Sequence, residues 1–528
     1  MRAASLGDLL KKPVVLNHSP LQVALFHANG RVFAIDNRCP HEGYPLVKGS
    51  VNSDCVLTCN WHNWKFRLED GRCIIGGDNV RSYPTRLEGD DVWVDVSPPP
   101  LHETRQTILS GLNKAFLERD FGRICREIAR LHFNGLDPKD ALREAIAWSH
   151  DRQEPGAGDG HAYAGAADWM MLAETLGDDF ERKLICFAES VDHMAFDSLR
   201  QPVFPYAGPG ERFERNAFVA AVENEDRTRV EGMTSRALSA GLHWQDLEES
   251  FVAAAMAHYA DFGHSVIYTS KIQELIKHLG DVVEPYVLLS HARQICYAMR
   301  EDLIPEFRDY ADILQALPEP ALNPGDVVEL ALPFPCNLKE AFQWLRTHVA
   351  SHPVTTVYNA LLTALARNLL HYDTRFGTSF DRTVSDNASW LALTHGVTFA
   401  SASRILCEKY PQYWRPALLQ MACFVGRNSR YLDKQLDATP WRVADAASFL
   451  ADAHEKLLDH GINEPIIAVH LVKTTMAVEA ELPLATPTCQ AALLASLNRF
   501  LHSPFKMKHS RRLARQAMTL VARDFADN

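Results

Sequence analysis

Two short pairs of cysteine and histidine residues limit what the first hundred residues of this chain can fold into. The first pair lies in Cys39-Pro-His41 and the second in Cys59-Asn-Trp-His62. Seventeen residues separate His41 from Cys59. Thiolates and imidazoles are ligands for iron and zinc, so the two pairs predict two loops that face each other across one metal site.

The residues around the two pairs have the pattern of a small β domain. Short apolar runs such as Leu21–Phe26 and Val32–Ile35 are separated by turn residues, and Asn29-Gly30 between these runs predicts a β-hairpin. Three consecutive prolines then predict a stiff connection. We therefore expect a β domain over residues 1–97 and a proline linker over residues 98–104.

The ligand types leave two kinds of metal site open. In a [2Fe–2S] cluster with mixed ligands, two thiolates hold one iron and two imidazoles hold the other. A Cys2His2 zinc site uses the same side chains, but zinc fingers need a helix that carries two histidines. The sequence near the pairs predicts no such helix, which favours the cluster. The predicted cluster ligands are Cys39, His41, Cys59 and His62.

Residues 10–96 resemble the Rieske family. Besides the ligand pairs, the resemblance rests on Gly43, Pro45, Leu46, Gly49, Trp64, Phe66, Gly71 and Pro84. Respiratory-complex Rieske proteins carry an extra cysteine in each loop, joined as a disulfide, and the matching positions here are Tyr44 and Trp61. The resemblance is therefore to the low-potential Rieske ferredoxins and oxygenase domains. It implies transfer of single electrons toward an oxygen-activating iron.

The electrons are expected to come from another protein. Gly156-x-Gly158-x-Gly160 is glycine-rich but follows no predicted strand, so we interpret it as a loop and not as a dinucleotide site. The chain thus offers no flavin or nicotinamide site. The expected partner is an external NAD(P)H-dependent reductase or ferredoxin.

Length and charge narrow the function classes. A chain of 528 residues is too long for one ordinary core, so two or more domains are expected. The formal net charge of −12 argues against nucleic acid or a membrane surface as partner. The sequence has no run of eighteen apolar residues and no signal-peptide pattern. Single cysteines inside apolar stretches indicate a reducing compartment, and we expect a cytoplasmic protein.

From residue 105 onward the pattern becomes helical. Apolar residues recur at spacings of three and four, for example over Phe121–Phe133, Trp244–His258 and Pro465–Glu481. The predicted fold class is therefore multidomain, with an all-β domain followed by a large all-α domain of helical-hairpin repeats over residues 105–528.

An internal repeat in the helical part carries histidines at a fixed phase. The tripeptide Leu-Gly-Asp begins fifteen residues after His161 and again fifteen residues after His264. His395 and His470 fit the same frame, the last one more weakly. Each unit is predicted to be a helix that opens with histidine, a turn, and a second apolar helix.

A second histidine precedes each of these four, near the end of the previous helix. Equivalent positions of stacked repeats face one interior, so about eight imidazoles could bind non-haem iron there, in a mononuclear or multinuclear site. The eight are His150, His161, His258, His264, His371, His395, His454 (or His460) and His470, and the candidate carboxylates are Glu144, Glu249, Asp261 and Glu464. The alternative is that the repeated histidines satisfy helix–helix contacts.

Two segments of the helical part, Phe262–Tyr268 and Leu393–Phe399, resemble the questin oxidase-like family, with a resemblance that covers roughly residues 105–500. It implies an oxygenase. The two halves together predict an O2-dependent monooxygenase, in which the cluster feeds electrons to the iron site and a small organic substrate, of the secondary-metabolite kind, is oxidised. The alternatives are an electron carrier whose helical part is a docking module, and a zinc metalloprotein. A homo-oligomer stays open.

Overall fold

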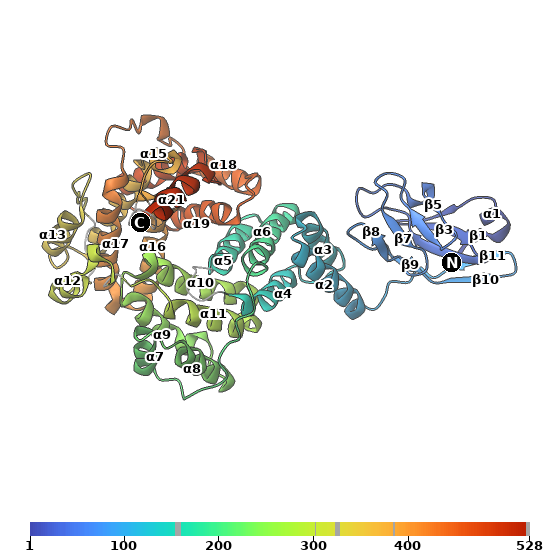
Figure 1. Ribbon diagram of the computed structural model, residues 1–528, viewed down its shortest axis with the longest axis horizontal. Coiled ribbons are helices and arrows are strands. Elements are labelled where there is room, and N and C mark those ends of the chain that lie inside the picture. The colour runs from blue at the N-terminus through green and yellow to red at the C-terminus, as the bar shows by residue number, and fades with distance from the viewer. Residues whose placement is uncertain (154–159, 301–302, 323–327, 384–385, 524–528) are drawn as a thin grey trace. The chain divides into compact units, whose positions relative to one another are not determined.

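The computed structural model describes residues 1–153, 160–300, 303–322, 328–383 and 386–523 (Figure 1). The chain divides into two compact units, Met1–Asp137 and Pro138–Asn528. The first contains all the strands and the second is helical, so the predicted fold class is confirmed. The first compact unit also holds helices α2 (Leu101–Glu118) and α3 (Phe121–Phe133). The predicted domain limits at residues 97 and 105 stay a prediction. Of the glycine-rich segment Gly156–Gly160, only Gly160 belongs to the described residues.

The strands form three small antiparallel sheets. The first, in the order β1-β11-β10, contains β1 (Arg2–Ser5), β11 (Asp91–Val94) and β10 (Thr85–Glu88). The second, β2-β3-β4-β9, contains β2 (Val14–His18), β3 (Leu21–Ala28), β4 (Arg31–Asp36) and β9 (Ser82–Tyr83). The third, β5-β6-β7-β8, contains β5 (Ser50–Val51), β6 (Val56–Thr58), β7 (Lys65–Arg67) and β8 (Cys73–Ile75). The predicted hairpin turn at Asn29-Gly30 joins β3 to β4.

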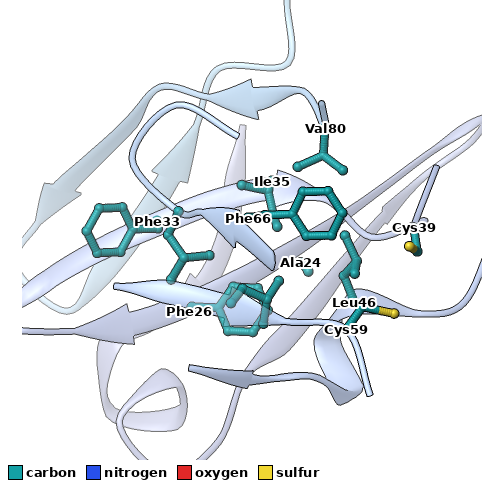
Figure 2. Close-up of a cluster of buried hydrophobic side chains, with 11 residues drawn as sticks. Ala24, Phe26, Phe33, Ile35, Cys39, Leu46, Cys59, Phe66 and Val80 are labelled. Carbon is teal, nitrogen blue, oxygen red and sulfur yellow. The ribbon is translucent and has the colours of Figure 1, made fainter. Parts of the chain in front are cut away.

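The second sheet has an apolar core on each of its faces. Successive strand residues point to opposite faces, so Phe26 and Ile35 enter one core while Leu25 and Ala34 enter the other. The first of these cores also takes Leu57 and Phe66 from the third sheet, together with Cys39 and Cys59 (Figure 2). The two cysteines are therefore part of the apolar core of the β domain.

Helix α3 is held to the β domain by a buried carboxylate. Asp78, in the loop after β8, is 5% exposed and accepts hydrogen bonds from Arg130 at 2.6 Å and Arg126 at 3.3 Å. Arg130 also pairs with Glu127 at 2.8 Å, on its own helix. Two guanidinium groups on one buried carboxylate offset the cost of removing that charge from water.

Four helices form the centre of the second unit. They are α5 (His161–Thr175), α10 (His264–Leu279), α16 (Trp390–Lys409) and α19 (Pro465–Glu481). They pack in a closed circuit: α5 against α10, α10 against α16, α16 against α19, and α19 against α5. Each is followed by a second helix that packs against it, and these are α6 (Phe180–Ser198), α11 (Glu284–Cys296), α17 (Trp414–Asn428) and α20 (Pro487–His502). The predicted helical hairpins are thus present.

Other helices surround these hairpins (Figure 1). They are α4 (Asp140–Ser149), α7 (Arg215–Glu223), α8 (Arg227–Ser239), α9 (Trp244–Met256), α12 (Tyr310–Ala316), α13 (Leu338–His348), α14 (Val354–Leu370), α15 (Arg375–Thr378), α18 (Ala446–Leu458) and α21 (Ser510–Arg523). The short helix α1 (Leu6–Leu9) belongs to the first unit. Within the described part of the chain, no helix is both long and apolar enough to cross a membrane.

The prediction that each unit opens with histidine holds for two units only. His161 and His264 are the first residues of α5 and α10. His395 and His470 are each the sixth residue of their helices. The helices α16 and α19 begin more than one turn earlier than their histidines, at Trp390 and Pro465.

A buried ion pair ties α8 to α11. Arg293 and Glu231 are each 1% exposed, and the guanidinium Nε donates to Glu231 Oε1 at 2.6 Å. The same guanidinium donates to the backbone carbonyls of Phe204 at 2.8 Å and Pro205 at 3.0 Å. Every nitrogen of this buried guanidinium therefore donates a hydrogen bond.

Glu231→Ala is expected to lower the free energy of unfolding by about 3–5 kcal/mol, because it leaves a buried guanidinium without its counter-charge. Urea denaturation followed by circular dichroism measures the change. Glu211→Ala is the matched control, since Glu211 pairs with Arg229 at the surface, and should cost less than about 1 kcal/mol. Equal losses in the two variants would contradict the structural role of the buried pair.

Candidate functional site

The two predicted cluster loops have the same backbone turn. In each, the cysteine N–H donates to the carbonyl five residues later, and the cysteine carbonyl accepts from the N–H four residues later, at a residue with positive φ. These residues are Cys39, Gly43 and Tyr44 in the first loop, and Cys59, Asn63 and Trp64 in the second. The turns place each cysteine at the core end of its loop.

The four predicted ligands form an inner sulfur pair and an outer nitrogen pair. Cys39 and Cys59 are 3% and 1% exposed, and the two thiols neighbour each other. His41 Nδ1 and His62 Nδ1 are 2.9 Å apart at the surface. Burial, with the neighbouring Cys59, raises the pKa of the Cys39 thiol to about 11.

This donor set fits a [2Fe–2S] group. A nearby cation stabilises the thiolate form of such a buried thiol, and a bound iron would supply that charge. Two thiols on the core side and two ring nitrogens on the solvent side match the mixed ligation of such a cluster. The loops lie between strands and not on a helix, so the site lacks the helix that a zinc finger requires.

Aromatic residues join the two loops at the positions that match the disulfide of respiratory-complex Rieske proteins. The ring of Tyr44 stacks on that of Trp61, with centroids 5.6 Å apart and planes 18° apart. Trp61 Nε1 also donates to Glu42 Oε2 at 3.2 Å. Trp64 stacks on His41 at 4.9 Å. These contacts hold the loops together without a covalent bond.

Comparison with known proteins agrees with this geometry. The Rieske [2Fe-2S] domain family matches residues 3–84. A ferredoxin subunit of 3-phenylpropionate/cinnamic acid dioxygenase from Shigella boydii is 31% identical over 83 residues, which is 15% of this chain and 77% of the relative. Through its N-terminal part, the chain belongs to the Rieske family.

Two further proteins are similar to the Rieske domain. The ferredoxin component of the alkene monooxygenase system of Xanthobacter autotrophicus is 36% identical over 80 residues, and the chain spans 66% of that relative's length and 15% of its own. The solved ferredoxin of carbazole 1,9a-dioxygenase from Nocardioides aromaticivorans is 24% identical over 97% of its own chain and 18% of this one. Its TM-score is 0.17, too low to support an argument.

In the helical unit, four of the eight predicted histidines meet. Their rings follow the circuit of the helices, with centroids 4.8 Å apart for His161 and His264, 4.4 Å for His264 and His395, 5.1 Å for His395 and His470, and 5.2 Å for His470 and His161. One nitrogen each of His161, His395 and His470 can be chosen so that all three lie within 4.8 Å of one another. We call these four residues the four-histidine centre.

His161, His395 and His470 offer neutral imidazoles, the form that binds a metal ion. Burial holds the pKa of His161, His395 and His470 well below its usual value, and nearby Lys473 adds to the effect at His161 and His470. His470 Nδ1 lies 2.6 Å from the Ile466 carbonyl, so it carries the proton and donates. His470 Nε2 is then unprotonated and has a free lone pair, and it lies 3.0 Å from His395 Nε2. Two ring nitrogens this close suit a shared cation.

The other four predicted histidines have separate partners. His150 stacks on Tyr206, His258 contacts Glu223 at 2.7 Å, His371 contacts the Asp433 carbonyl at 3.2 Å, and His454 contacts Glu479 at 2.6 Å. The alternative His460 pairs with Glu189 at 3.3 Å. The structure does not bring these residues to the four-histidine centre. The contact of His454 joins two helices, α18 and α19, whereas the partners of His150 and His371 lie outside helices.

The candidate carboxylates whose side chains are described do not join the three-histidine group. Glu249 pairs with Arg215 and accepts from Gln412 at 2.9 Å. Glu144 lies on α4, Glu464 precedes α19, and the side chain of Asp261 is outside the described residues. Among the described residues, no carboxylate joins the three-histidine group.

The sequence analysis missed a second polar layer on the same helices. Lys271 pairs with the fully buried Asp168 at 2.7 Å, and the Lys473 ammonium lies 5.5 Å from the ring of Tyr268. Burial lowers the pKa of Lys473 to about 8. The signal was available, because these residues follow the histidines of α5, α10 and α19 by three, four or seven positions, which lie on one helix face.

A small cavity adjoins this polar layer. It has a volume of about 20 Å³ and is lined by residues of α5, α10 and α11 that include Tyr163, Tyr268, Lys271 and Gln294. A space of this size holds about one water molecule.

The buried histidines should make the metal-free protein acid-sensitive. Their folded pKa values lie below the unfolded value near 6.5, so below that pH the unfolded chain binds protons that the folded chain does not. The free energy of unfolding should fall as pH falls from 6.5, by up to about 1.4 kcal/mol per pH unit for each histidine. Urea titrations at pH 7.5 and 5.5 measure it. His395→Gln should reduce the difference, whereas the exposed substitution His18→Gln should not; an unchanged pH dependence in His395→Gln would contradict the prediction.

Proposed function

We propose that this protein is an O2-dependent monooxygenase in which the Rieske cluster supplies electrons to a non-haem iron at the four-histidine centre, with a small organic molecule as substrate. The observation that carries the proposal is the meeting of His161, His264, His395 and His470 from four different helices in a buried interior. Gathering four imidazoles in one interior costs them hydration, and coordination of a metal would offset that cost.

The combination of the two sites favours iron over zinc. Imidazole binds both metals, so the centre by itself does not choose. A Rieske domain in the same chain provides electrons, which a zinc hydrolase cannot use. An iron bound at the centre would supply oxygen activation, a chemistry that needs such electrons.

The residues of the chain would have distinct tasks. The four histidines would bind and orient the metal through unprotonated ring nitrogens, and the surrounding helices would exclude water from it. The Lys271–Asp168 pair and Lys473 would place ionisable groups beside the centre. In the Rieske domain, Cys39, Cys59, His41 and His62 would hold the cluster, with the imidazoles at the surface where a partner can approach.

The relatives support an electron-transfer role beside an oxygenase. They are a ferredoxin component of an alkene monooxygenase system and a ferredoxin subunit of a dioxygenase. We infer that a fused ferredoxin-like domain replaces a separate one here, and that an external NAD(P)H-dependent reductase or ferredoxin reduces it. The questin oxidase-like resemblance of residues 105–500 agrees with an oxygenase and stays a prediction.

Metal content and Mössbauer spectroscopy on protein expressed with iron-57 test the proposal. Iron clearly above two per chain, with a high-spin ferrous or diferric signal beside that of the cluster, is expected. His264→Ala should remove the additional iron and leave the cluster signal intact. His371→Ala is the control, because His371 lies away from the centre, and should keep all the iron.

Two irons per chain, all in the cluster signal, would contradict the iron site once metal loss during purification is excluded. That result would favour the alternative, an electron carrier whose helical part is a docking module. Zinc at the centre, without O2 consumption, would contradict both.

Cys39→Ser tests the independence of the two units. It should abolish the visible absorption of the cluster, because one iron loses a thiolate ligand. The helical unit has its own core, so the helical circular dichroism and the iron at the four-histidine centre should remain. Loss of the helical signal would show that the units fold together.

A further inference from the structure

The last described helix turns its apolar side to solvent. In α21, in red in Figure 1, Leu513, Met518, Leu520 and Val521 are 60%, 73%, 67% and 49% exposed. Positions 513, 517, 520 and 521 follow the spacing of one helix face, so Leu513, Ala517, Leu520 and Val521 form a continuous apolar stripe. Met518 is an exposed apolar side chain beside it. We call it the α21 stripe.

Polar side chains on the opposite face attach α21 to the helical unit. Arg512 is 6% exposed and donates to the carbonyls of Ser379 at 2.8 Å and Phe376 at 2.7 Å. Gln516, one turn further on, donates to Asn387 Oδ1 at 3.1 Å. A helix that only covers a core presents the reverse orientation, with its apolar face inward. The outward stripe is therefore held in place by specific hydrogen bonds.

Exposed cations lie on α21 and in the residues just before it. Arg511 and Arg515 lie on the face opposite Leu513, with their guanidinium groups 3.6 and 5.8 Å from the centre of the Phe380 ring. Lys506, Lys508, Arg511 and Arg515 are exposed, and residues 506–522 contain no Asp or Glu. The whole chain has a formal net charge of −12, so this segment is a local exception. Screening limits the reach of distant carboxylates to about 10 Å at ordinary ionic strength, so a partner at α21 meets positive charge.

We propose that α21 docks the protein on an anionic lipid surface. The positive charge of this segment attracts anionic headgroups over a screening length, while the leucine, methionine and valine side chains can enter the acyl boundary. Pairing of two α21 stripes from two copies would bring two cationic sets together, which is unfavourable. An acidic protein fits less well, because the stripe has no aromatic anchor or hydrogen-bonding group of the kind that dominates protein interfaces.

This docking does not conflict with the fold or the charge of the chain. It needs no membrane-spanning helix, and none is found among the described residues. The net charge predicted no membrane partner because it averages over the whole chain, whereas binding depends on the residues near the surface that is bound. The proposal is independent of the oxygenase function.

Vesicle flotation with the full-length, cluster-containing protein tests the proposal. Vesicles of equal parts phosphatidylglycerol and phosphatidylcholine should bind the protein, and vesicles of phosphatidylcholine alone should not. High salt should weaken the binding. The double variant Leu513→Glu with Leu520→Glu should bind at least about tenfold more weakly, because two leucines no longer enter the apolar boundary.

Two further variants keep the test sharp. Leu513→Ala with Leu520→Ala preserves helix propensity and removes apolar area, so it should also bind more weakly even if the glutamates disturb α21. Leu117→Glu with Leu484→Glu makes the same change at sites that are 57% and 53% exposed elsewhere, and should bind like the unchanged protein.

Three results would overturn the proposal. They are absence of binding to the anionic vesicles, equal binding to both kinds of vesicle, and binding that the α21 variants leave unchanged. Self-association in analytical ultracentrifugation that the same variants abolish, without any vesicle binding, would assign the stripe to a second copy of the chain instead.

Discussion

The burial of four imidazole rings among four mutually packed helices is the constraint on which the helical unit depends. Each ring loses water on folding, and His161, His395 and His470 stay neutral because their surroundings disfavour charge. Apolar side chains at the same positions would pack at lower cost. The fold therefore maintains a polar centre that packing does not require, and coordination of a metal is the interaction that would offset it.

The Rieske domain solves a similar problem with a different architecture. Its two loops repeat one turn, so Cys39 and Cys59 lie at the core and His41 and His62 at the surface. Apolar packing holds the sulfur side rigid, while stacked aromatic rings join the outer parts of the loops. The predicted cluster ligands are thus fixed on one side and open to a partner on the other, an arrangement that suits transfer of single electrons.

The repeat in the helical part was informative because equivalent positions of stacked hairpins do converge. That reasoning predicts that His161, His264, His395 and His470 lie together. It failed to separate them from His150, His258, His371 and His454, since all eight lie on or beside apolar helices. The side chains of His150, His258, His371 and His454 contact a tyrosine, a carboxylate or a carbonyl of a neighbouring segment instead. Sequence spacing does not contain that information.

By itself, the sequence determined the fold class, the membership of the N-terminal part in the Rieske family, and the pairs that would hold its cluster, because closely spaced ligands and short-range periodicity are local properties. Only the tertiary structure decided which histidines meet, that Asp168, Lys271 and Lys473 accompany them, and that α21 turns its apolar side outward. These depend on how helices far apart in the chain rotate and pack against one another, and helix rotation is fixed by the sum of all contacts and not by any one segment.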